Sequence, residues 1–295
     1  MLVNDFPSLF LKVPERGKLH DVQKSAPTLF GQKMKLINLL RSLTGKIRTR
    51  GANRRLGAYL AFVAGAVNAG GFLAVQQYTS HMTGIVSSVA DDLVLGNQSL
   101  ALAGLCALSA FVMGASTTAI LVNWARNRCM HSVYVLPLVL EALLLMLFGL
   151  LGAHLKFSFA IFSPMTVILL CFVMGLQNAI VTKISNAEIR TTHVTGIVTD
   201  VGIELGKLVY WNGRKKQGSA HFVDANRKKL ADLLLILLMF FFGGLIGAMG
   251  FKSLGFIVTL PFALILLLLA SVPIMDDFLF WVRRGKIKER STIRK

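Results

Sequence analysis

The chain has 295 residues, of which 54% are hydrophobic and only 16% are charged, and its mean hydropathy is +0.63. A soluble domain carries about 25% charged residues, so this composition excludes a disordered chain, a coiled coil and an ordinary cytosolic enzyme. It indicates an integral membrane protein. The net charge of +18 is also typical of nucleic-acid-binding proteins, so the positions of the charges have to decide between the two.

Six apolar runs are long enough to cross a bilayer as helices. They are Leu56–Val75, Ser99–Val122, Val133–His154, Pro164–Val181, Leu230–Phe251 and Leu254–Ile274. The seven segments around them hold, in order, 12, 0, 2, 1, 9, 1 and 7 Lys and Arg residues. Alternate segments share a side, and the positive-inside rule makes the basic side cytoplasmic. The sequence therefore predicts an all-α, six-span membrane protein with cytoplasmic termini and no nucleic-acid partner.

The charge pattern divides the chain into a basic arm (1–55), two membrane repeats (56–163 and 164–275) and a basic tail (276–295). Within the arm, Lys33–Arg50 is amphipathic and either lies along the anionic inner leaflet or forms a solvated tail. The three Cys residues form no CxxC or His/Cys cluster, and no catalytic motif is present. We therefore expect no enzyme activity, cofactor or metal. A homodimer fits a six-span protein, although no residue points to one.

The chain contains an internal repeat. Phe62–Ala69 (FVAGAVNA) recurs as Phe172–Ala179 (FVMGLQNA), and Ser80–Val86 (SHMTGIV) recurs as Thr192–Val198 (THVTGIV). Ten of these 15 aligned positions are identical, which indicates a duplication. Each half has three predicted spans, so the second half enters the bilayer from the opposite side. Such an inverted repeat is common among secondary transporters.

A short segment follows each repeated span: Thr83–Leu95 in the first half and Thr195–Tyr210 in the second. Both have helical patterns with Thr83 and Thr195 placed as N-caps, and both are too short to span a bilayer. They are either re-entrant half-helices or surface helices. A re-entrant half-helix would offer backbone N–H groups and a positive dipole end to an anion or carboxylate. As a surface helix, it would leave His81 and His193 as interfacial caps.

Asn68 and Asn178 lie inside spans, where an amide needs a polar partner. Either they line a polar site beside Gln177, or they bond each other where the first and fourth spans pack through Gly65 and Gly175. The substrate-binding candidates from both repeats and from Glu141 are Asn68, His81, Thr83, Gly84, Glu141, Gln177, Asn178, His193, Thr195 and Gly196.

Glu141 is the acidic residue placed deepest in a predicted span. A carboxylate in hydrocarbon is costly, so this side chain is protonated, paired or beside water, and acts either in solute or proton movement or in a structural bond. Asp91 and Asp92 are expected to end a solvated segment. Asp200 and Glu204 fall on one helical stripe with Lys207, which predicts a surface ion pair.

The Phe62–Phe72 block (FVAGAVNAGGF) and the Ser80–Gly84 block (SHMTG) resemble the YoaK-like family of small bacterial inner-membrane proteins, grouped under a domain of unknown function. The resemblance covers roughly residues 56–275 and implies a six-span protein without a known substrate, cofactor or reaction. Family members typically carry Asp where this chain has Asn68, so this chain lacks an intramembrane carboxylate there. The sequence thus predicts a transporter or channel for a small polar or anionic solute, or else a non-transporting membrane scaffold.

Overall fold

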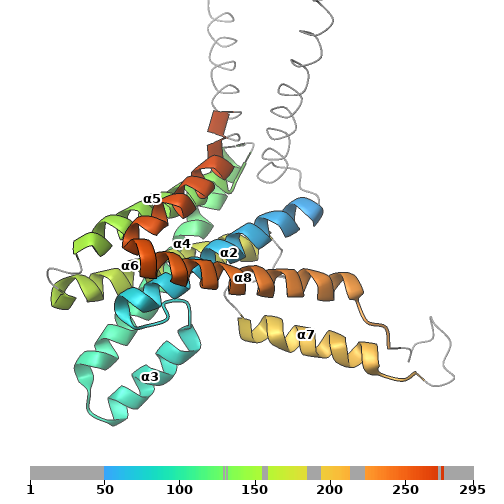
Figure 1. The fold of residues 1–295 in the computed structure, drawn as a ribbon, viewed down its shortest axis with the longest axis horizontal. Helices are drawn as coiled ribbons and strands as arrows, with labels where there is room; N and C mark the ends of the chain where they lie inside the picture. Colours follow the sequence, from blue (N-terminus) through green and yellow to red (C-terminus); the bar gives the residue numbers. More distant parts are fainter. Residues whose placement is uncertain are drawn as a thin grey trace, which may run out of the picture. The chain divides into compact units, whose positions relative to one another are not determined.

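The computed structural model describes residues 50–128, 130, 132–154, 159–184, 194–212, 223–271 and 274–275. Every regular element in these ranges is a helix, which confirms the all-α class for this part of the chain (Figure 1). The elements are α2 (Arg50–Val75), α3 (Met82–Val94), α4 (Gln98–Asn127), α5 (Val135–His154), α6 (Phe159–Ile184), α7 (Val194–Val209), α8 (Arg227–Leu254) and the 3-10 turn η1 (Gly255–Val258). Helical residues 259–271 follow η1.

Four helices in the described ranges are long and apolar enough to cross a membrane: Gly51–Val75, Gln98–Asn127, Ser163–Ile184 and Arg227–Ser271. The last has 45 residues, which would extend about 67 Å, twice the hydrocarbon thickness. It is interrupted at Gly255, whose φ of 67° suits glycine, and so covers the fifth and sixth predicted spans. A shorter apolar helix, Val135–Leu150, stands at the third. The helices fit a multi-pass membrane protein, and the count of six stays a prediction.

α2 and α8 cross at a contact that requires glycine on both helices. A Cβ on Gly65 would overlap the carbonyl oxygen of Phe240, and a Cβ on Gly243 would overlap that of Phe62. Each glycine is the fourth residue of a Phe-x-x-Gly sequence, so the contact is reciprocal. The lack of side chains lets the two backbones approach closely, as is common between membrane helices.

α4 and α6 meet through the same reciprocal contact. A Cβ on Gly114 would overlap the carbonyl oxygen of Phe172, and a Cβ on Gly175 would overlap that of Phe111. The expectation that Gly65 and Gly175 pack the two repeated spans against each other is therefore wrong. Gly65 instead contacts α8, and Gly175 contacts α4. These partners carry the same Phe-x-x-Gly sequence, and each is the long helix that follows one of the two short segments.

Contacts along the helices fix their relative directions. Gly57 of α2 faces Ile236 of α8 and Gly70 faces Phe251, so the residue numbers rise together and the two helices are parallel. α4 and α6 are parallel as well, because Gly114 faces Phe172 and the Thr118 hydroxyl donates to the Leu176 carbonyl at 2.9 Å.

The repeated helices α2 and α6 run antiparallel. The Asn53 amide donates to the Ile184 carbonyl and the Gln177 amide donates to the Leu60 carbonyl, both at 3.1 Å, so the numbers rise on one helix as they fall on the other. These two helices form the core, with long runs of fully buried residues, whereas α4 and α8 carry many exposed apolar side chains. An apolar outer surface around a packed centre is what a bilayer requires.

Candidate functional site

The first repeated corner connects α2 to α3. The chain reverses after Val75 through Gln76, which has a positive φ of 56°. The Ser80 hydroxyl then donates to the Asn68 side-chain oxygen at 2.8 Å, which ties the corner back to α2. The predicted bond between Asn68 and Asn178 is not formed. Asn68 is half-buried, and its partner lies in the neighbouring repeated block.

His81, not Thr83, precedes α3 as its N-cap, and its side chain makes no capping hydrogen bond. Thr83 is the second residue of α3, and Thr195 is the second residue of α7. The N-cap predictions for both threonines are therefore wrong, because each helix starts two residues earlier than an N-cap at the threonine implies. Both threonine side chains are exposed.

The His81 ring lies over the first turn of α3. A Cβ on Gly84 would overlap this ring, so the imidazole can occupy this position because residue 84 has no side chain. His81 itself is exposed. In the second half, Gly196 occupies the equivalent position in α7, while His193 lies outside the described residues.

The two short helices pack in equivalent places. In one buried cluster, Ile85 of α3 meets Ala107 of α4 and Cys171 of α6. In a second cluster, Ile197 of α7 meets Ile236 of α8 and Ala61 of α2. These three pairs match by the repeat: Ile85 and Ile197 are 112 residues apart, Ala107 and Ile236 are 129 apart, and Ala61 and Cys171 are 110 apart. Each cluster takes its third helix from the other half. The halves are therefore interlocked.

α3 runs antiparallel to α4, since Val89 contacts Gly104 while Ile85 shares a cluster with Ala107. α7 runs antiparallel to α8, since Glu204 binds Asn226 and Asp200 pairs with Lys229. Each short helix therefore starts beside the middle of the long helix that follows it and ends beside that helix's N-terminus. A helix lying on the membrane surface would instead meet only the end of a spanning helix.

The contact between α2 and α6 holds an unpartnered polar atom. The Gln177 side chain is fully buried. Its amide nitrogen donates to the Leu60 carbonyl, and its oxygen has no hydrogen-bond partner among the residues that the structure describes. The paired residue numbers of this antiparallel contact sum to 237, so Asn68 of α2 is level with residue 169 of α6. Residue 169 is nine residues before Asn178 on the same helix. The two asparagines are therefore about 13 Å apart along the helices. The predicted site is thus split, with Gln177 next to Asn178 at one level and Asn68 at the other.

Glu141 is fully buried on α5, and within the described part of the chain neither carboxyl oxygen has a hydrogen-bond partner. α5 starts beside the end of α6, where the Tyr134 hydroxyl donates to the Lys183 carbonyl at 3.1 Å. Glu141 lies seven residues beyond Tyr134, and Gln177 lies six residues before Lys183. Because α5 runs antiparallel to α6, the two side chains are at about the same height. Buried unpaired polar groups are costly, and in a membrane protein they mark functional positions.

Two clefts lie at equivalent places in the two halves. The first, which we call the α4–α6 cleft, has a volume of about 540 Å³. Its polar lining residues are Gln77, Ser88, Asp92, Ser99 and Ser163, and Pro164, Ile168 and Cys106 are among its apolar ones. The second, the α2–α8 cleft, has a volume of about 410 Å³ and is lined by Gly51, Arg54, Arg55, Ala58, Tyr59, Leu235 and Met239.

Matching residues of α2 and α6 are 110 residues apart, so Pro164 matches Arg54 and Ile168 matches Ala58. Matching residues of α4 and α8 are 129 residues apart, so Cys106 matches Leu235. The two clefts therefore lie at opposite ends of the antiparallel α2–α6 pair. None of the described predicted site residues lines either cleft. Serine hydroxyls on exposed turns of α3 and α4 carry too little sequence signal to have identified the first cleft.

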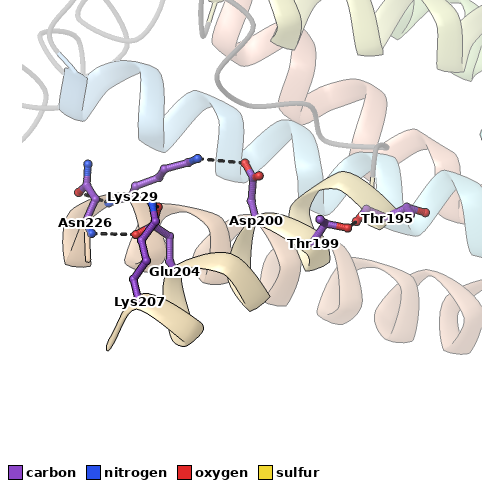
Figure 2. Close-up of polar contacts among 7 residues, drawn as sticks. All are labelled: Thr195, Thr199, Asp200, Glu204, Lys207, Asn226 and Lys229. Carbon is purple, nitrogen blue, oxygen red and sulfur yellow. Dashed lines mark hydrogen bonds and ion pairs between the residues drawn. The ribbon is translucent and has the colours of Figure 1, made fainter. Parts of the chain in front are cut away.

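An ion-pair network fastens the end of α7 to the start of α8 (Figure 2). Glu204 accepts from the Lys207 ammonium at 2.9 Å and from the Asn226 backbone N–H at 2.8 Å, and Asp200 pairs with Lys229 at 3.1 Å. The hydrogen bond from Lys207, followed by that from Asn226, lowers the pKa of the Glu204 carboxyl below its ordinary value of 4.5. The predicted Glu204–Lys207 pair is confirmed, although Glu204 is buried and also holds α8.

The first half repeats this arrangement in weaker form. Asn97 is the N-cap of α4, as Asn226 is of α8, and Asp92 matches Glu204 at the repeat spacing. The Asn97 side chain donates to Asp92 at 3.3 Å, on the surface. The sequence contained this signal, because an acidic residue precedes an Asn-led helix in both halves, but the different loop lengths hid it.

A comparison with known families finds a match over most of the chain. A family model described as a protein of unknown function (DUF1275) matches residues 56–272. This match confirms the resemblance carried by the Phe62–Phe72 and Ser80–Gly84 blocks. No curated protein and no solved structure matches the chain.

Proposed function

Because the chain belongs to the DUF1275 family, whose function is unknown, we propose its function from the geometry: a secondary transporter or channel for a small polar or anionic solute. We propose six spans in two inverted repeats, with both termini in the cytoplasm of a bacterial cell and no catalytic activity. The antiparallel course of α2 and α6 supports the inversion. The parallel pairs α2–α8 and α4–α6 have the directions that six alternating spans require.

One observation carries the proposal: each short helix begins beside the middle of a long helix. In a bilayer this makes α3 and α7 half-helices with N-termini at mid-depth, as in transporters built from inverted repeats. The polar corner at His81 then lies within the membrane, and Glu141 and Gln177 stand between the two halves. Irregular backbone at such depth is tolerated where it lines a cavity or is buried in protein.

Uptake into liposomes tests transport. We expect the purified full chain to take up at least one class of a radiolabelled panel of phosphate, sulfate, small carboxylates, amino acids and sugars. Glu141→Gln and Gln177→Leu should each lower that uptake at least tenfold, because the first replaces the buried ionisable carboxyl with an amide and the second removes a buried acceptor that a passing solute would use. Asp91→Asn, an exposed acidic position, is the matched control and should retain uptake. Absence of uptake across the panel, or equal uptake by all variants, would favour a membrane scaffold.

Thiol labelling tests the depth of α3. In a chain whose native cysteines are replaced, a single cysteine at Asn97 should react quickly with a membrane-impermeant maleimide in vesicles. A cysteine at Thr83, the second residue of the proposed half-helix, should react at least tenfold more slowly, because its access is narrower. Both positions are exposed in the isolated protein, so detergent-solubilised chain provides the control for intrinsic reactivity. Equal rates in vesicles would make α3 a surface helix.

A further inference from the structure

The α2–α8 cleft combines two arginines with an apolar floor. Arg54 and Arg55 lie in the second turn of α2, and Ala58, Leu235 and Met239 line the same space of about 410 Å³. The Arg54 guanidinium is paired with Asp232 at 2.9 Å. Arg55 is exposed and forms no ion pair with any residue that the structure describes, so its charge is available to a ligand.

The arginines are not part of the packing that the two halves share. Their counterparts at the repeat spacing are Pro164 and Met165, both uncharged, and only Pro164 lines the α4–α6 cleft. The helix crossing forms equally well without the charges, because the glycine contacts are the same in both halves. The positive charge is therefore a separate feature of one cleft.

The position of this cleft indicates what it binds. Under the proposed orientation, the start of α2 lies at the cytoplasmic membrane surface, because it belongs to the predicted basic arm 1–55. Tyr59, a ring type that favours the headgroup level, is half exposed at the cleft. The charged groups are followed along α2 by apolar ones, which is the order that a phospholipid presents from headgroup to chain.

We propose that the α2–α8 cleft binds one anionic phospholipid of the inner leaflet. The phosphate lies at Arg55 and Arg54, whose planar guanidinium groups suit phosphate oxygens, and an acyl chain lies against Ala58, Leu235 and Met239. Basic pockets between helices on the cytoplasmic side are a known form of lipid-headgroup site. A soluble anion would gain nothing from the apolar floor. This site is independent of transport and rests only on the proposed orientation.

Lipid binding to the purified full chain in detergent tests this. Native mass spectrometry should show phosphatidylglycerol retained more tightly than phosphatidylcholine with the same acyl chains. Arg55→Gln should weaken phosphatidylglycerol binding roughly fivefold, which corresponds to one basic residue near a lipid surface. This change leaves the Arg54–Asp232 pair intact, so the fold is retained. Arg126→Gln, at an exposed arginine of α4 outside both clefts, is the matched control and should change nothing.

Three results would overturn the site. Equal retention of the two lipids would remove the headgroup specificity. An equal loss in Arg55→Gln and Arg126→Gln would reduce the effect to general surface charge. Displacement of phosphatidylglycerol by millimolar inorganic phosphate would make the cleft a soluble-anion site. Because binding is measured without a transport assay, failure of the transporter proposal leaves each of these results interpretable.

Discussion

The two halves of the molecule share a packing plan and differ in their charges. The α3–α4–α6 side and the α7–α8–α2 side use matching clusters, Phe-x-x-Gly contacts and asparagine caps. Yet one cleft holds Asp92 and serine hydroxyls, and the other holds two arginines. The backbone contacts are the same in both halves, since each crossing requires a glycine on both of its helices. Surface charge changes without disturbing that contact, so it is where the two halves can take on separate roles.

The shared packing can be broken most strongly at its glycines. Gly65→Ala and Gly175→Ala each place a Cβ against a backbone carbonyl that has no side chain to move aside. We expect both to destabilise the protein by about 3 kcal/mol, and by similar amounts, because the contacts are equivalent. Thermal unfolding in detergent, followed by size-exclusion chromatography, measures this.

Gly202→Ala is the control, since a Cβ there meets nothing within 4 Å. Removing a glycine from a helix interior should stabilise α7 by about 0.5–1 kcal/mol. If Gly65→Ala were harmless while Gly175→Ala unfolded the protein, the two crossings would not be equivalent.

How much of the fold could be predicted from the sequence depends on how long and how distinctive each repeated pattern is. The duplication was visible because FVAGAVNA and its copy are ungapped, and their antiparallel partnership follows from an odd number of spans. The α4–α8 equivalence was missed because it rests on two residues, Phe and Gly, in apolar helices where both are common. The pairing of Gly65 with α8 was equally beyond the sequence. A small residue permits a close contact without specifying the partner.

Glu141 sharpens the comparison, because it places a carboxyl of the first repeat deep inside a predicted span. Glu141→Leu removes a fully buried carboxyl that lacks hydrogen bonds. We expect the protein to become more stable by about 2 kcal/mol while solute uptake is lost, because the group is retained at a cost to stability. Thermal unfolding and liposome uptake of the same preparation decide this. A destabilised variant would show that the carboxyl has a structural partner.

The carboxylates that hold the two capped helices should respond differently to acid. The pKa of Glu204 is lowered by Lys207 and Asn226, so its stabilising effect is present above its ordinary value of 4.5. That effect is lost as the pH falls through the lowered pKa. We expect the wild type to lose thermal stability below about pH 4.5, and Glu204→Gln to be less stable at neutral pH with a flatter pH profile. An unchanged profile in this variant would assign the acid sensitivity to another group.

The matching change in the first half should have the smallest effect. The Asp92 carboxylate accepts a 3.3 Å hydrogen bond from the Asn97 side chain on the surface, where water competes for the same atoms. We expect Asp92→Asn to alter stability by less than about 0.5 kcal/mol at any pH, measured by the same thermal unfolding. Asp92 also lines the α4–α6 cleft, so an uptake change without a stability change would give this carboxylate a role in solute selection. A large stability loss would instead mean that α3 is held to α4 as firmly as α7 is held to α8. The difference in charge between the halves would then have no effect on how stably each short helix is attached.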